Sequence, residues 1–168
     1  MRLKTDMTPQ QVRELFDYDP ATGRLVWRVR KSPCIPIGSV AGSPKPDGYL
    51  VVKIAGKYWN AHRLAWLHFH GEWPARHLDH INGNRADNRM ANLREVSPSE
   101  NAQNRHGAST RSKTGLLGVG QATRTPGKWT AKIKAGDTIK HLGSFDSPEL
   151  AHAAYLKAKR ELHPFGTL

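Results

Sequence analysis

The sequence contains no long hydrophobic run. Among its 168 residues, uninterrupted apolar stretches span only a few positions, as from Leu64 to Leu67, whereas a helix that crosses a bilayer needs ~20 apolar residues. The first residues, MRLKTDMTPQQVRELF, also lack the apolar segment and the cleavage site of a secretory signal. We therefore expect a cytoplasmic protein that has no membrane partner.

Cysteine and acidic residues are also scarce. The single cysteine, Cys34, cannot form an internal disulfide, and it cannot build a zinc site of mainly thiolate ligands. The 14 Asp and Glu stand against 26 Lys and Arg, which gives a formal net charge of +12 and a pI near 10.2. A small protein this basic most often binds a polyanion.

The positive charge is concentrated at the two ends of the sequence. Residues 1–60 hold 10 basic and 5 acidic side chains, residues 61–106 hold 6 and 5, and residues 107–168 hold 10 and 4. The nearly neutral middle contains six of the nine histidines: His62, His68, His70, His77, His80 and His106. This distribution favours a reaction centre between two flanks that bind a polyanion, with uneven surface charge as the alternative.

Local signals predict short helices and strands in the first seventy residues. Thr8 and Gln11 form a capping box around Pro9, so a short helix with an apolar stripe ending at Phe16 should begin there. The elements expected after it are a strand at 25–27, a loop-rich stretch at 31–48, a hairpin with strands 49–54 and 57–61, and a helix at 62–70.

The His-rich middle predicts the order strand, turn, strand, helix. The expected elements are a strand at 78–81, a polar turn at 82–89, a strand at 92–96, a helix at 98–105 and a basic linker at 107–117. Ser97 as N-cap and Glu100 three residues later support the start of the helix.

Three polar residues in this region have the chemistry that phosphodiester hydrolysis requires. The reaction needs a proton acceptor for water and positive charge beside the phosphate, which a divalent cation supplies. His80 is a suitable base near neutral pH, and Asp79 and Asn101 carry oxygen ligands that Mg²⁺ accepts. Because neighbours on a strand point to opposite faces, the strand must end or bulge at Asp79 and His80 if both act on one phosphate.

Two runs of sequence resemble a known nuclease family. HRLAWLHFHGEWP at 62–74 and LDHINGNRADNRMANLREVSPSENAQN at 78–104 strongly resemble the HNH nucleases of the ββα-metal class, in the phage and homing endonuclease branch. FDYDPATGRLVW and GYLVVKIAGKYWNAHRLAW are similar to the usual lead-in of that branch. The resemblance covers about residues 8–106.

The resemblance implies roles for individual residues. The metal-binding acid falls on Asp79, the general base on His80, and the Asn that ties the hairpin loop together on Asn92. The helix residue that completes the metal site falls on Asn101, where many relatives have His. An all-oxygen ligand set favours Mg²⁺, with Mn²⁺ as a substitute, over Zn²⁺. Since the paired cysteines of other HNH proteins are missing, we expect no structural zinc.

Two arginines close to the motif have more than one interpretation. For Arg63, which precedes an apolar helix, packing and a phosphate contact are both open. For Arg105, one turn beyond Asn101, the choice lies among capping, an ordinary surface position and phosphate binding. We take both as candidate DNA-binding residues, and we interpret His68 and His70 as ordinary helix residues.

The C-terminal third predicts a small sheet followed by a helix. Between residues 129 and 134, apolar side chains alternate with Thr and Lys, which is typical of a strand with one buried and one basic face. A second strand at 138–142 and a helix that begins at 146–149 should follow. The segment 118–162 resembles an AP2 domain, in which three strands backed by one helix read the DNA major groove.

The AP2 resemblance implies a DNA-binding face. Its candidate DNA contacts are Arg124, Lys132, Lys134 and His141. Gly120 stands where that family often has a base-reading Arg, so the base preference is open, while Lys and Arg still confer affinity for phosphates. A solvated basic face is the alternative.

Together these features predict an α+β protein of two modules. We expect an HNH nuclease domain at 1–106 with its core motif at about 77–106, a linker at 107–117 and an AP2-like DNA-binding domain at 118–168. The expected activity is Mg²⁺-dependent nicking of double-stranded DNA by a monomer or weak dimer without a small-molecule cofactor, in a bacterial host cell if phage-encoded. The alternatives are a DNA-binding protein without catalysis, which uses the AP2-like domain, and an RNA-binding module.

Overall fold

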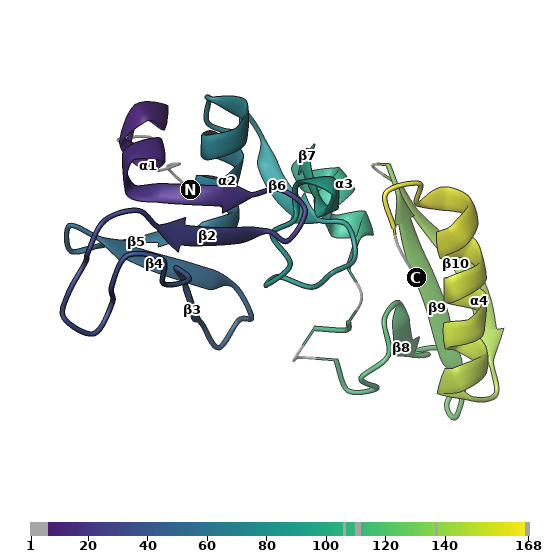
Figure 1. Cartoon of the computed structure of the whole chain (residues 1–168). Helices are drawn as coiled ribbons and strands as arrows, with labels where there is room; N and C mark the ends of the chain where they lie inside the picture. Colours follow the sequence, from purple (N-terminus) through teal and green to yellow (C-terminus); the bar gives the residue numbers. More distant parts are fainter. Residues whose placement is uncertain (1–6, 106, 110–111, 137, 167–168) are drawn as a thin grey trace. The chain divides into compact units, whose positions relative to one another are not determined.

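The computed structural model describes residues 7–105, 107–109, 112–136 and 138–166. The other residues, among them 110–111 of the predicted linker and His106 at the predicted domain boundary, lie outside this description. The chain groups into two compact units, Met1–Ser97 and Pro98–Leu168, whose elements are labelled in Figure 1. Each unit has a hydrophobic core of its own. The mixed α and β composition confirms that part of the predicted fold class, and none of the described helices is long and apolar enough to cross a membrane.

The first unit alternates short helices and antiparallel strand pairs. Its elements are α1 (Pro9–Leu15), β1 (Phe16–Asp19), β2 (Arg24–Trp27), β3 (Ser43–Pro44), β4 (Leu50–Ile54), β5 (Lys57–Asn60), α2 (Ala61–His70), β6 (His77–His80), the 3-10 turn η1 (Met90–Asn92) and β7 (Leu93–Val96). The sheets are β1–β2, β3–β4–β5 and β6–β7. Helices α1 and α2 pack on each other, so the core collects side chains from both helices and from the first two sheets.

Helix α1 ends one residue earlier than its apolar stripe predicts. Its capping box between Thr8 and Gln11 is present as expected. Phe16, however, has extended backbone and begins β1, where it pairs with Trp27 and its ring lies 4.4 Å from the Trp27 ring. Pairing across the β1–β2 hairpin therefore outweighs the helical periodicity at this position.

The β4–β5 hairpin and α2 match the sequence interpretation closely. The hairpin turns at Ala55 and Gly56, both with positive φ, and α2 begins one residue before the predicted start. Gly71, with φ 77°, ends the helix in the left-handed conformation that glycine adopts without strain. These elements place the start of α2 beside the β6–β7 hairpin through ring contacts of His62.

The second unit is a three-stranded antiparallel sheet with a long helix on one face. Its elements are α3 (Pro98–Gln103), β8 (Val119–Gln121), β9 (Trp129–Ala135), β10 (Thr138–Phe145) and α4 (Pro148–Leu162), with β9 central in the sheet. Figure 1 shows α4 lying along this sheet. Ala131 and Ile133 are buried with Tyr155, as the alternation predicts, and a Cβ at Gly118 would lie 2.0 Å from the Tyr155 ring.

The chain divides between Ser97 and Pro98, whereas the predicted boundary lies at 107–117. Lys159, only 1 % exposed, donates from Nζ to the Arg105 carbonyl at 2.7 Å. Lys159, in the last turn of α4, thus connects the chain after α3 to this helix within the second unit. Leu117, at the end of the predicted linker, packs against the second core and accepts a hydrogen bond from His152. Helix α3 ends at Gln103, shorter than the predicted 98–105.

Candidate active site

Asp79 and His80 lie at the end of β6. In the β6–β7 ladder, Asp79 pairs with Arg94 and His80 with Leu93. The strand ends at His80, whose carbonyl accepts from the backbone N–H of Gly83 as the turn begins. The two neighbours therefore lie where the strand ends and the turn begins, which is the arrangement expected if both act on one phosphate.

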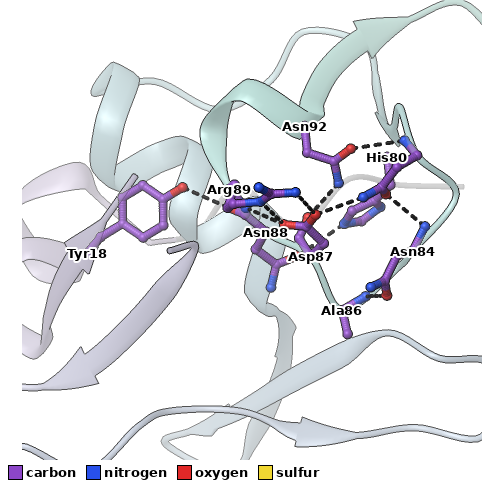
Figure 2. Close-up of polar contacts among 9 residues, drawn as sticks. Tyr18, His80, Asn84, Ala86, Asp87, Asn88, Arg89 and Asn92 are labelled. Carbon is purple, nitrogen blue, oxygen red and sulfur yellow. Dashed lines mark hydrogen bonds and ion pairs between the residues drawn. The ribbon is translucent and has the colours of Figure 1, made fainter. Parts of the chain in front are cut away.

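The His80 ring has a defined hydrogen-bond partner. Its Nε2 lies 3.1 Å from Oδ1 of Asn88, in the loop between β6 and η1 (Figure 2). An amide oxygen only accepts hydrogen bonds, so Nε2 carries the proton and Nδ1 holds the lone pair of the neutral ring. The basicity of the neutral ring therefore lies on Nδ1.

Two other rings pack against His80. The His62 ring meets it edge to face at 5.1 Å, and the Tyr49 ring lies at 5.8 Å. Burial lowers the pKa of His80, although Asn88 and two acidic neighbours act in the opposite direction. Burial chiefly lowers the pKa of His62 to about 3, and repulsion from His80 when it is protonated and from Arg63 adds to this, so the His62 ring is neutral. At neutral pH both imidazoles are neutral, and His80 is in the form that a base needs.

Arg94 holds Asp79 across the hairpin. Its Nε and Nη2 donate to Oδ2 of Asp79 at 3.1 and 2.9 Å, and the two side chains are 22 % and 10 % exposed. This pairing fixes the carboxylate in one orientation and keeps positive charge beside it. A metal ion at Asp79 would share the carboxylate with this guanidinium.

Asn92 ties the two ends of the intervening loop together. Its Oδ1 accepts from the backbone N–H of Asn82 at 3.0 Å, and its Nδ2 donates to the Asp87 carbonyl at 2.8 Å. The Asp87 carboxylate in turn accepts from Arg89 and Asn82 (Figure 2). These contacts shape the loop that carries Asn88, which is the hydrogen-bond partner of His80.

Asn101, the other predicted metal ligand, lies exposed on α3 in the second unit, and its partnership with Asp79 stays a prediction. Among the described residues, no group of three or more His, Cys, Asp or Glu could hold a metal ion. The oxygen donors of Asp79 and Asn101 fit Mg²⁺, which is commonly held by one or two carboxylates and several waters.

The predicted DNA-binding residues fall into two groups. Arg63 is half-buried with its guanidinium over the Trp73 ring at 5.3 Å, which favours the packing interpretation. The other candidates are exposed in the second unit: Arg105, Arg124, Lys132, Lys134 and His141. Lys132 pairs with His141 across the β9–β10 ladder, so these two side chains share the sheet face opposite α4.

A comparison with known protein families finds an HNH motif that covers the end of the first unit and helix α3. Residues 60–103 match the family model described as HNH endonuclease. This segment is similar to the HNH endonucleases. Among solved structures, the HNH homing endonuclease I-HmuI, described for its DNA binding and cleavage, matches with 26 % identity and a TM-score of 0.40, covering 53 % of this chain and 50 % of that chain. The chain thus spans about half the length of that homing endonuclease, and no curated protein matches it.

The match over residues 60–103 confirms the resemblance to HNH nucleases predicted for this part of the sequence. Sequence reasoning missed Asn88 and Arg94. Arg94 could have been found by aligning the predicted strands, because cross-strand partners of opposite charge stabilise a hairpin. Asn88 gave no such signal, because it sits among several polar residues of an irregular turn. The HNH match ends before the second unit's sheet, so the AP2-like assignment stays a proposal.

Proposed function

We propose that the chain is a divalent-metal-dependent endonuclease that nicks double-stranded DNA, with His80 as the general base. The observation that carries this proposal is the position of His80 at the end of β6 in the HNH segment, with Nε2 bonded to Asn88 and Nδ1 as the basic nitrogen. A histidine that is neutral at neutral pH and has a fixed ring is suited to remove a proton from an attacking water.

In this mechanism, His80 Nδ1 takes the proton of the water as its oxygen attacks phosphorus, and the bond to the leaving 3′ oxygen breaks. The imidazolium that forms is stabilised by the Asn88 amide oxygen and by the charges of Asp79 and Asp87, which oppose the lowering of the His80 pKa by burial. Arg94 keeps the Asp79 carboxylate oriented. Asp79 and Asn101 would hold a divalent cation, which supplies charge stabilisation at the phosphate and the leaving oxygen.

The basic face of the second unit supports a role in holding DNA. Lys132, Lys134 and His141 are exposed on β9 and β10, and phosphate contacts by such residues confer affinity without base specificity. We propose that this AP2-like sheet anchors the nuclease. One active site in each chain then cuts one strand at each engagement, so a monomer or weak dimer nicks.

Cleavage of supercoiled plasmid in Mg²⁺, in Mn²⁺ and in EDTA tests this function. We expect open-circular DNA to precede linear DNA with either metal, and no cleavage in EDTA. Linear product without an open-circular precursor would contradict nicking. Binding to the same plasmid without cleavage in both metals would instead favour a DNA-binding protein without catalysis.

A further inference from the structure

The β1–β2 hairpin, far from the HNH motif in sequence, contacts the backbone of residues 88–90, and Asn88 is the hydrogen-bond partner of His80. The Tyr18 hydroxyl donates to the Asn88 carbonyl at 2.7 Å (Figure 2), and the Met90 backbone N–H donates to the Pro20 carbonyl at 3.1 Å. Both contacts involve residues 88–90, so hydrogen bonds join the β1–β2 hairpin to this segment.

Gly23 allows the β1–β2 turn to approach the backbone of Asn88 and Arg89 closely. Its φ of 74° belongs to the left-handed region, and a Cβ there would lie 2.4 Å from the Arg89 nitrogen and 2.5 Å from the Asn88 carbonyl carbon. No side chain can stand in that gap without moving one of the segments. The close approach therefore requires glycine for two independent reasons.

Asn88 links this contact to the active site. Its side chain is 3 % exposed and bonds to His80 Nε2, while its own carbonyl receives the Tyr18 hydroxyl. Burial, with Asp19 and Asp87 nearby, raises the pKa of Tyr18 to about 12, so the phenol keeps its proton and continues to donate. A displacement of the Asn88 backbone would thus move the amide oxygen that sets the His80 tautomer.

We propose that the β1–β2 hairpin is a positioning element for His80: Tyr18 on β1 and Gly23 in the turn fix the Asn88 backbone, and the Asn88 amide holds Nε2–H so that Nδ1 is the basic nitrogen. Tyr18, Pro20 and Gly23 lie outside the matched HNH segment, 60–103. The proposal rests on the proposed role of His80 as base, and it adds two positioning residues that act through Asn88.

The test compares Tyr18→Phe, Asn88→Ala and the double variant with the wild type, using Tyr58→Phe as the matched control. Tyr58 is 58 % exposed and lies on β5. We expect kcat to fall by about 10-fold in Tyr18→Phe and roughly 100-fold in Asn88→Ala, within the range of general-base catalysis, with KM unchanged. Because Tyr18 acts through Asn88, the double variant should be no slower than Asn88→Ala.

The tautomer of His80 is a second readout, which would not change if Tyr18 and Asn88 only stabilised the fold. Long-range ¹H–¹⁵N NMR should give the Nε2–H form in the wild type and in Asn88→Asp, which keeps an acceptor oxygen, and a mixture of tautomers in Tyr18→Phe and Asn88→Ala. If Asn88→Ala does not fold, the spectrum and kcat of Tyr18→Phe decide alone, since that change removes a single oxygen atom.

Wild-type kcat and tautomer in Tyr18→Phe, or losses that multiply in the double variant, would overturn the positioning role. His80→Ala distinguishes a failure of the proposed function from a failure of the positioning role. An active His80→Ala contradicts the proposed function itself, whereas an inactive His80→Ala beside a fully active Tyr18→Phe contradicts only this inference.

Discussion

Around His80, hydrogen bonding and packing act on different parts of one ring. Asn88 holds Nε2, while His62 packs edge to face against the ring from the first turn of α2. In the described part of the chain, the buried Nδ1 of His62 has no hydrogen-bond partner. His62 therefore supports His80 by its shape, and its neutral ring brings no competing positive charge.

Substitutions of His62 test whether its ring supports His80 by packing or takes part in proton transfer. His62→Phe keeps an aromatic ring at this position, so kcat should stay within about threefold of the wild type. His62→Ala should lower kcat by roughly 10-fold and the free energy of unfolding by about 2 kcal/mol, because it leaves a cavity beside His80. Plasmid cleavage and urea unfolding measure both. A Phe variant as slow as the Ala variant would assign a chemical role to the imidazole.

Arg94→Met tests whether Asp79 binds metal. Removing Arg94 leaves a partly buried carboxylate without its cation, which should lower the free energy of unfolding by roughly 3 kcal/mol without metal. Mg²⁺ should then raise the melting temperature of Arg94→Met more than that of the wild type, because it replaces the lost charge. Equal shifts in both proteins would count against Asp79 as a ligand.

At the scale of elements, the loop between β6 and η1 depends on polar side chains for its shape. Hydrogen bonds from Arg89 hold the pKa of Asp87 at about 2, below its ordinary value of 3.8. Because the pKa is lower in the folded state, the carboxylate stabilises the fold above about pH 4, and this contribution disappears as the pH falls toward about 2.

Asp87→Asn should therefore destabilise the protein by about 1–2 kcal/mol near neutral pH, since hydrogen bonds to a charged group are lost. The difference from the wild type should shrink as the pH falls from about 4 to 2. Thermal unfolding across this pH range measures it. A difference that persists unchanged at the lowest pH would show that the Asp87 charge does not support the loop.

Elements with local signals could be predicted, and elements set by tertiary contacts could not. The capping box at Thr8 fixed the start of α1, and Gly71 fixed the end of α2, because both act within one turn of chain. Phe16 belongs to β1 and not to the predicted helix, because it pairs with Trp27 in the β1–β2 hairpin. Within the site, adjacent Asp79 and His80 were visible in the sequence, whereas Asn88 acquires its place only when the loop folds back.

At the scale of the whole chain, the two compact units meet between Ser97 and Pro98, whereas the composition predicts a linker at 107–117. The basic C-terminal segment does form a separate unit. The chain after α3 belongs to the second unit, where buried Lys159 donates to the Arg105 carbonyl. A buried lysine of this kind depends on a distant backbone acceptor, which local sequence patterns do not reveal.

The basic face of β9 and β10 should set the salt dependence of DNA binding. Replacing both Lys132 and Lys134 by Ala should weaken binding and lower the slope of log K against log salt by up to about 2, roughly one for each lost phosphate contact. Lys157→Ala is the control, because Lys157 is exposed on α4, which packs on the other face of the sheet. An unchanged slope in the double variant would remove this face from the DNA interface.

The central claim is that His80 is the base of a DNA-cleaving site, and single-turnover cleavage by His80→Ala tests it most directly. DNA binding is measured in the same reactions, and His77→Ala, exposed on the same strand, serves as the control. The account predicts that His80→Ala binds DNA like the wild type but loses at least about 100-fold in the Mg²⁺-dependent rate, as expected for loss of a general base, while His77→Ala cleaves normally. Wild-type cleavage by His80→Ala would contradict it.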